Sequence, residues 1–253
     1  MKPHGYILIG VLALFLGCDE SVVAPEAGRS ETPKPADTQL FAAKNAVVSF
    51  TAVQTFQPAG PAGARGVLTE GDTFEPTKGS TAEIQRGADY LQVNIHTTGL
   101  PPGAYTTWWA IINEPDACVP STDPAFPDIV GDCGFDEVFD FNPETGEVGP
   151  SLPSVFWSTG GIVQSNGVGN FQDRTRVGEA FGDPFPLQHL WGPGLTSPAS
   201  AIVFYIIKYH GPPSDDPDEL YAQTHTLLGL CDDRANGLPD GNCFDPQWAV
   251  FSD

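Results

Sequence analysis

Carboxylate and amide side chains crowd the segment between two cysteines near the C-terminus, which reads CDDRANGLPDGNC over residues 231–243. Proteins bind Ca²⁺ through carboxylate and carbonyl oxygens, and a disulfide-closed loop would hold such ligands in place. The sequence therefore predicts calcium as a candidate cofactor. Its candidate ligands are Asp232, Asp233, Asn236, Asp240 and Asn242.

The spacing within this segment is not that of an EF-hand. Counting from Asp232 as the first ligand, Arg234 takes the third position and Cys243 the twelfth, where acidic or amide ligands are needed. The alternative interpretation is turn formation, since Asp and Asn bond their own backbone and tolerate left-handed conformations. Residues 132–142 form a second acidic loop with the same two interpretations.

Histidines offer a second kind of chemistry, with His96, His189, His210 and His225 as candidates for a metal or catalytic site. His210 and His225 flank a loop rich in Pro and Asp. If they meet beside a carboxylate in a cleft, they would serve an extracytoplasmic enzyme. The spacings HxH, HxxxH and HExxH are all absent, which favours surface and strand-end histidines instead. A Gly-x-Ser-x-Gly elbow and a glycine-rich phosphate loop are absent too.

Five tryptophans could stack on sugar rings in a binding module, but four of them lie in predicted strands, where core packing is the better explanation. Trp191 is the exception, because it lies in a predicted loop. It is therefore a candidate ligand contact. The five are Trp108, Trp109, Trp157, Trp191 and Trp248.

The chain is strongly acidic. It has 11 basic and 32 acidic residues among 253, a net charge of −21. This charge repels a phosphate backbone, so nucleic acid is excluded as a partner. Two roles of the acidity stay open, namely solubility and cation binding.

The N-terminus has the features of an export signal. Lys2 precedes a ten-residue apolar run, residues 7–16, which is too short to span a bilayer as a helix. At its end, Phe-Leu-Gly-Cys18 resembles the lipobox of bacterial lipoproteins, which implies lipidation of Cys18 and a membrane partner reached through the lipid. The alternative is an ordinary secretory signal. Residues 1–17 are thus expected to be a signal peptide and residues 18–45, rich in Pro, Ser, Thr and Glu, a flexible tether.

Four cysteines remain after Cys18 and fall into two sequence-local pairs. In an exported protein this pattern predicts two local disulfides, Cys118–Cys133 and Cys231–Cys243. Each would close a short loop and stabilise the folded state by about 3 kcal/mol in the chain-entropy model.

Residues 46–253 are expected to form one all-β domain, an antiparallel β-sandwich with long acidic loops. Residues 88–113 read as two strands joined by a Gly/Pro turn. The first alternates apolar and polar residues, so one face is buried, whereas AYTTWWAII is apolar on both faces and predicts a strand covered on both sides. Asn166-Gly167 predicts a second hairpin, with a type I′ turn, between residues 154–164 and 168–175.

The other expected elements are short. Strands are predicted at 47–53, 66–69, 81–86, 201–210 and 247–251, with a strand or helical turn at 221–228. Residues 114–152 form a long acidic loop, and loops of this length are often functional.

Part of the domain resembles a known family. The runs SFTAVQTFQPAG and GADYLQVNIHTTGLPPGAY are similar in order to the opening strands of CHRD-type β domains. The second half, with KYHGPP, QTHTLLGLC and FDPQWAVF, resembles uncharacterised bacterial secreted proteins. These resemblances imply a β fold and an exported location, and they bring no activity.

The sequence favours an exported, lipid-anchored binding or scaffolding protein, with a protein or carbohydrate partner and the acidic loops as contact surface. One alternative is a calcium-dependent carbohydrate-binding or adhesion module. The other is an extracytoplasmic enzyme that uses His210 and His225.

Calcium binding is tested by the thermal midpoint of the oxidised chain from Asp19 to Asp253, in millimolar calcium and again with chelator. We expect calcium to raise the midpoint by several degrees, because an ion that binds only the native state stabilises it. Equal midpoints in both buffers would contradict the calcium hypothesis and leave these carboxylates as solubilising turn residues.

Overall fold

The structure is a computed structural model and describes residues 46–57, 73–122, 128–142, 144–179, 189–227, 229 and 243–252. The expected signal peptide and tether lie outside these residues, as do the strand predicted at 66–69 and the acidic segment 231–242. None of the described helices is long and apolar enough to cross a membrane.

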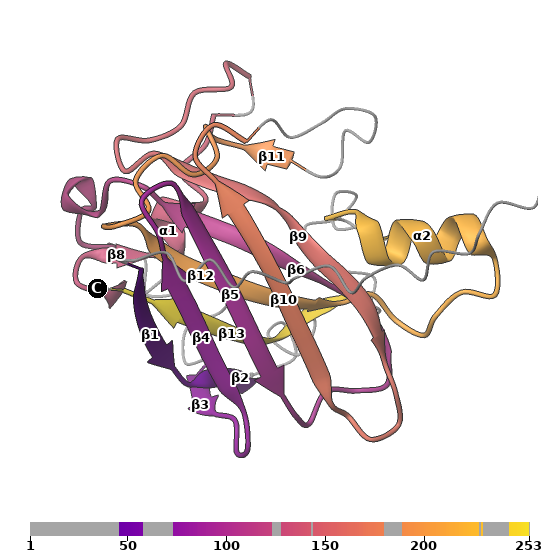
Figure 1. Ribbon diagram of the computed structural model, residues 1–253. Coiled ribbons are helices and arrows are strands. Elements are labelled where there is room, and N and C mark those ends of the chain that lie inside the picture. Colours follow the sequence, from indigo (N-terminus) through magenta and orange to yellow (C-terminus); the bar gives the residue numbers. More distant parts are fainter. Residues whose placement is uncertain are drawn as a thin grey trace, which may run out of the picture. The chain divides into compact units, whose positions relative to one another are not determined.

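Two antiparallel sheets pack against each other, which confirms the predicted sandwich (Figure 1). The four-stranded sheet has the order β1 (Val47–Thr51), β4 (Thr81–Arg86), β5 (Tyr90–Thr97) and β10 (Gly169–Arg176). The seven-stranded sheet has the order β11 (His189–Trp191), β9 (Pro153–Val163), β6 (Gly103–Ile112), β12 (Ile202–Tyr209), β13 (Phe244–Phe251), β2 (Val53–Gln57) and β3 (Thr73–Pro76).

Smaller elements complete the described fold. They are the pair β7 (Asp128–Val130) and β8 (Cys133–Gly134), the 3₁₀ turn η2 (Pro115–Ala117), and the helices α1 (Phe135–Val138) and α2 (Pro217–His225).

The main core lies between the two sheets. Tyr105, Trp109 and Ile111 project from β6 into it, and the inward residues of β5 meet them from the other sheet. A polar network crosses this core, because Asp173 Oδ2 on β10 accepts hydrogen bonds from Trp109 Nε1 at 2.7 Å and from Ser158 Oγ at 2.8 Å. The network therefore joins β10, an edge strand of the four-stranded sheet, to β6 and β9 of the other sheet.

A second core covers the opposite face of the seven-stranded sheet. Phe135 on α1 stacks on Trp248 of β13, with ring centroids 4.4 Å apart, and also contacts Phe204 of β12. Every residue of β6 is buried, as the apolar pattern on both its faces predicted. The long acidic loop, residues 114–152, is thus a covering layer, since it carries Phe135 and the fully buried Val138.

Both predicted hairpins are wrong, because each joins strands of different sheets. β5 pairs with β4 and β10, whereas β6 pairs with β9 and β12, so residues 98–102 cross between the sheets. β9 and β10 likewise lie in different sheets. Figure 1 shows β4, β5 and β10 lying across β6, β12 and β13. A strand buried on one side and a strand buried on both sides belong to different layers.

The turn at Asn166-Gly167 is not of type I′. Gly167 N donates to Gln164 O at 3.0 Å, which makes Ser165 and Asn166 the central residues. Neither has a positive φ, whereas Gly167, the fourth residue of the turn, has φ 68°. This arrangement fits a type I turn, in which Gly is favoured at the last position.

Two further elements differ from their predictions. The strand expected at 47–53 is divided at Ala52 into β1 and β2, which belong to different sheets. Residues 221–225 of the segment predicted as a strand or helical turn at 221–228 belong to α2, which starts earlier, at Pro217, and ends at His225. Asp216 caps this helix by accepting from the backbone N–H groups of Asp218 and Glu219, and proline at the first helical position is favourable.

Replacement of Trp109 by Ala tests the central core. Trp109 is fully buried, and its removal leaves a cavity and takes one donor from Asp173. We expect the free energy of unfolding in urea to fall by about 3–5 kcal/mol. The control is Phe50→Ala, which removes a ring that is 71% exposed and should change the value by less than about 0.5 kcal/mol. Similar losses in both variants would contradict this description of the core.

Candidate functional site

The outward side of the four-stranded sheet carries a polar surface crossed by aligned rows of side chains. Register places Phe50 opposite Glu83, Glu83 opposite Asn94, and Asn94 opposite Gln172. One row therefore runs from β1 through β4 and β5 to β10. We call the outward side of these four strands the amide face, since five amide side chains lie on it. Their positions are Gln85, Gln92, Asn94, Asn170 and Gln172.

Alternation along the strands explains why these residues face solvent. The odd-numbered residues of β5 from Leu91 to Ile95 are buried in the core, so the even-numbered ones point away from it. On β10 the buried residues Phe171 and Thr175 alternate with exposed Asn170, Gln172 and Arg174 in the same way. The period of two thus fixes both the core and the amide face.

Hydrogen bonds between neighbouring strands hold the face in order. His96 Nδ1 lies 2.8 Å from Asn170 Oδ1, which can only accept, so the imidazole donates. Arg174 Nε donates to Gln92 Oε1 at 3.0 Å, and its guanidinium lies over the Tyr90 ring, 4.6 Å from the centroid. Such cross-strand pairs fix side-chain positions before any ligand arrives.

A depression of about 380 Å³ lies on the amide face. Its volume falls in the range of sites for small ligands, roughly 300–1,000 Å³. At one end the Phe50 ring is 71% exposed. The lining residues are Phe50, Thr81, Glu83, Asn94, Ile95, His96, Asn170, Phe171 and Gln172.

The depression carries little charge for so acidic a protein. Glu83 is the one carboxylate among its lining residues, and Asn94 Nδ2 lies 3.5 Å from Glu83 Oε1. The nearby Arg176 is paired with Asp89 at 3.2 Å. This surface therefore combines amide and hydroxyl groups with one carboxylate and the exposed Phe50 ring.

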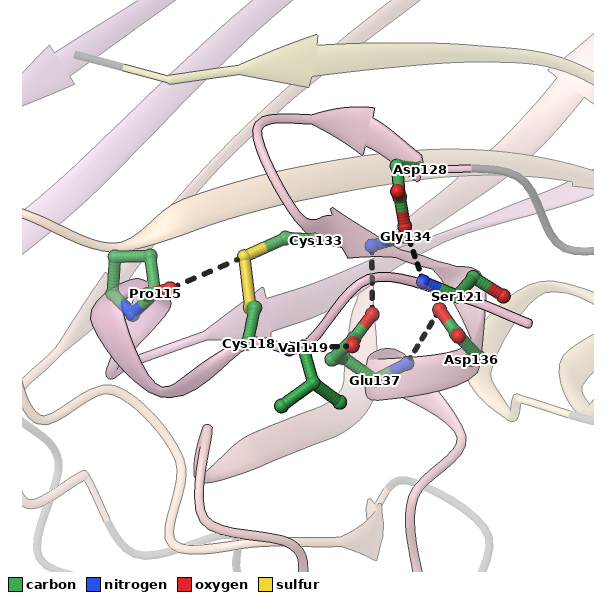
Figure 2. Close-up of a disulfide and its surroundings, with 9 residues drawn as sticks. All are labelled: Pro115, Cys118, Val119, Ser121, Asp128, Cys133, Gly134, Asp136 and Glu137. Atoms are coloured by element: carbon green, nitrogen blue, oxygen red, sulfur yellow. Dashed lines mark hydrogen bonds between the residues drawn. A yellow bond between two sulfur atoms is a disulfide. The ribbon is translucent and has the colours of Figure 1, made fainter.

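The predicted disulfide Cys118–Cys133 is present, with 5.2 Å between the Cα atoms. Beside it Glu137 Oε2 accepts from Gly134 N at 2.8 Å, and Oε1 accepts from Val119 N at 3.3 Å (Figure 2). Burial raises the pKa of the Glu137 carboxyl, and Asp136 raises it further. The carboxylate thus braces the disulfide loop.

The second predicted disulfide is not described in full, because Cys231 lies outside the described residues. Of two predicted bonds, the described residues contain one. Cys243 is itself disulfide-bonded. Its pairing with Cys231 stays a prediction.

The calcium ligands predicted at 232–242 also lie outside the described residues, as does Cys18. Residues 132–142 are described, and three of their side chains, Asp136, Glu137 and Asn142, accept hydrogen bonds from backbone N–H groups of the loop. Asn142 Oδ1, for example, accepts from the N–H groups of Glu144 and Thr145. Within the described part of the chain, no three His, Cys, Asp or Glu residues gather as a metal site would require.

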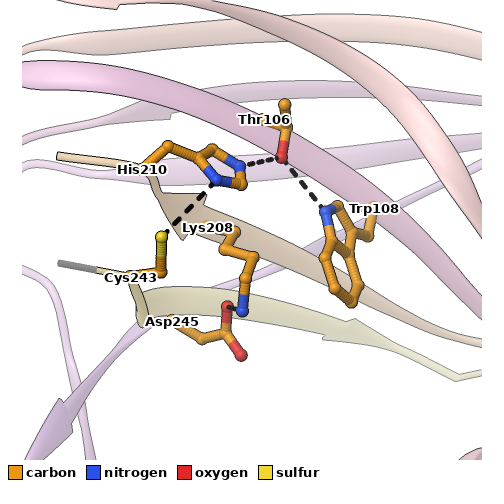
Figure 3. Close-up of polar contacts among 6 residues, drawn as sticks. All are labelled: Thr106, Trp108, Lys208, His210, Cys243 and Asp245. Atoms are coloured by element: carbon orange, nitrogen blue, oxygen red, sulfur yellow. Dashed lines mark hydrogen bonds and ion pairs between the residues drawn. The ribbon is translucent and has the colours of Figure 1, made fainter. Parts of the chain in front are cut away.

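His210 lies in a buried polar cluster (Figure 3). Its Nε2 is 2.6 Å from Thr106 Oγ1, which accepts a hydrogen bond from Trp108 Nε1, and its Nδ1 is 3.9 Å from Cys243 Sγ. Burial, and then the charge of Lys208, lower the pKa of His210 to about 3. The imidazole is therefore neutral at ordinary pH and a weak base. A disulfide-bonded Cys243 cannot act with it as a nucleophile.

His225 has different surroundings from His210. It lies on α2, stacked on Tyr221 with ring centroids 4.1 Å apart and on Trp157 at 5.9 Å. Its Nδ1 lies 2.8 Å from Thr224 Oγ1. Among the described residues, His210 and His225 therefore bond and stack with different neighbours.

Trp191, the candidate sugar platform, is half-buried at the end of β11, an edge strand of the seven-stranded sheet. Its Nε1 donates to Val138 O at 3.0 Å, and its ring stacks on Phe141 with centroids 5.1 Å apart. The ring therefore supports the covering layer. His189 lies on the same strand.

Most of the amide face was not predicted from the sequence. The alternation of β5 indicates its polar side, including Asn94 and His96, but does not show that Phe50, Asn170 and Gln172 are their neighbours. The alternation of VGNFQDRT was a usable signal, since Asn170 and Gln172 alternate with Phe171. The pairing of β10 with β5 depends on contacts far apart in the chain, which no local pattern shows.

Comparison with known proteins adds no relative. The chain matches no family model, no curated protein and no solved structure. The resemblance to CHRD-type β domains and to bacterial lipoproteins therefore stays a prediction.

The buried imidazole predicts a specific loss of stability in acid. His210 binds protons less readily in the native state, with a pKa of about 3, than in the unfolded chain, with about 6.5. Stability from this residue is full above pH 6.5 and is lost as the pH falls toward 3. Between pH 7 and pH 5 the titration of His210 lowers the free energy of unfolding by about 2 kcal/mol.

Urea unfolding at pH 7 and pH 5 measures this loss of stability. We expect the wild-type chain to lose about 2 kcal/mol more across this interval than His210→Gln, which has no imidazole. The comparison uses each variant's change with pH, so any general destabilisation by the substitution cancels. An equal change in both proteins would show that His210 does not titrate in this way.

Proposed function

We propose that this chain is an exported, lipid-anchored binding protein whose ligand contacts the amide face. The observation that carries the proposal is the depression on that face, which amide side chains of β5 and β10 line together with the exposed Phe50 ring of β1. This proposal moves the contact surface away from the acidic loops. The loop from 114 to 152 supports the second core with its apolar residues and bonds its own backbone with its polar ones.

Export is supported by the N-terminal sequence and by cysteine chemistry. The apolar run at 7–16 and the lipobox-like residues ending at Cys18 favour a lipidated protein at the periplasmic or outer side of a membrane. Disulfides persist in oxidising compartments, so the Cys118–Cys133 bond favours the same location. In this proposal residues 18–45 tether the domain, and its ligand lies within reach of the cell envelope.

The nature of the face favours binding over catalysis. Its side chains lie on paired strands, and cross-strand hydrogen bonds hold several of them in place. Because the surface is preorganised, little conformational entropy is lost when a ligand binds. The enzyme hypothesis based on His210 and His225 gains no support, since His210 is a weak base and the two residues have separate partners.

Sedimentation with isolated cell envelopes of the producing organism tests the proposal. We expect the oxidised, lipid-free chain from Asp19 to Asp253 to co-sediment with the envelopes. The double variant Asn94→Ala/Gln172→Ala should bind at least about tenfold more weakly, because each lost hydrogen-bonding side chain contributes about 1 kcal/mol.

The matched control is Gln164→Ala, which removes an exposed amide in the turn after β9, outside the four strands of the amide face. It should sediment like the wild-type chain. A wild-type chain that stays in the supernatant, or equal binding by the double variant, would contradict the proposal.

A further inference from the structure

We infer that the amide face takes a neutral glycan, an uncharged polysaccharide or oligosaccharide, with Phe50 against a sugar ring and the amides on its hydroxyl groups. This inference rests on the proposed function and names the class of ligand. It follows from the hydrogen-bonding groups, the exposed ring, the charge and the dimensions of the face.

The hydrogen-bonding groups of the face match those of a sugar. A hydroxyl both donates and accepts, and an amide side chain offers two donors and one carbonyl acceptor within one plane. Asn170 Oδ1 is occupied by His96, which leaves its amide nitrogen turned to other acceptors. Gln172 lies two residues after Asn170 on β10, is also exposed, and adds a second amide. Asn94 lies opposite Gln172 and adds a third.

Phe50 supplies an apolar surface at the end of this row. Its ring is 71% exposed, although the burial of a phenyl ring is strongly favourable. The C–H groups on one face of a sugar ring form an apolar patch that complements the negative face of an aromatic ring. One exposed ring beside several amides is thus suited to a ligand that is apolar on one face and hydroxylated at its edge.

Charge selects against ionic ligands. The net charge of −21 repels anionic polymers such as nucleic acids and polyuronates. A polycation would need many carboxylates, but Glu83 is the one carboxylate among the residues that line the depression. A carboxylate also accepts hydrogen bonds from hydroxyl groups, so Glu83 is compatible with a neutral sugar.

The dimensions favour a chain over a single sugar. The row from Phe50 to Gln172 crosses three strand spacings, about 14 Å in all. The depression of about 380 Å³ lies along a sheet surface, and its lining residues come from all four strands. A linear glycan can lie across these strands and contact several rows at once.

Affinity electrophoresis of the full chain, purified in a neutral detergent, tests the ligand class. Native gels would contain a β-glucan, a starch-type α-glucan, a xylan or a galactomannan, and a further gel would contain anionic polygalacturonate. We expect at least one neutral polymer to retard the wild-type chain and polygalacturonate to leave its mobility unchanged.

Variants at Phe50 link the retardation to the face. Phe50→Ala should weaken it about fivefold or more, whereas Phe50→Trp, which keeps an aromatic surface, should retain it. The control Val119→Ala, which shortens a 65% exposed apolar side chain in the loop after β6, should migrate like the wild-type chain. This pattern separates ring stacking from a general effect of removing apolar surface.

Three results would overturn the inference, namely no retardation by any neutral polymer, retardation by polygalacturonate, or equal retardation of wild type and Phe50→Ala. If envelope sedimentation still depends on Asn94 and Gln172 in that case, the binding surface stands and the ligand class is wrong. Loss of that sedimentation after protease treatment of the envelopes would then identify a protein partner. If sedimentation fails as well, the proposed function fails with it.

Discussion

The burial of β6 on both faces is the constraint on which the described fold depends. A strand with Trp108 on one face and Trp109 on the other cannot leave either face in water without exposing large apolar surface. The fold therefore needs two covering layers. The four-stranded sheet provides one of them, and the disulfide-braced loop with α1 provides the other. Because the inward face of the four-stranded sheet covers β6, its outward face is left exposed to solvent.

The local sequence patterns predicted which residues are buried, but they did not predict which strands pair with each other. The apolar residues on both faces of β6 and β12 correctly indicated central strands, and 81–86 was correct at both ends. The same patterns gave two hairpins that do not exist. A turn rich in Gly and Pro between two apolar runs forms equally well within one sheet or between two sheets, and Asn166-Gly167 lies in a connection of the second kind. Pairing is decided by contacts between distant segments, as between β10 and β5, and these leave no mark on either segment alone.

The candidate site was only partly predictable for the same reason. The polar side of β5 can be identified from its alternation, since Asn94 and His96 lie between buried residues. Phe50 lies in the strand predicted at 47–53, and its exposure follows only from the position of β1 at the edge of its sheet. The loop residues favoured by composition proved to have structural roles where they are described. Glu137 stabilises a disulfide loop and Asn142 stabilises a turn. Acidic and amide residues between strands often have such roles, because their side chains form hydrogen bonds with the nearby backbone.

The position of Phe50 on an edge strand has a further consequence. Exposed apolar residues on a sheet edge favour pairing with other chains, and natural proteins usually avoid them. Here Val48 and Phe50 face outward on β1, which forms one edge of the four-stranded sheet. The net charge of −21 opposes such association by repulsion between copies. The same charge repels anions and has little effect on neutral molecules. In the proposed function, the acidity that opposes association through an exposed ring would therefore also select against anionic ligands.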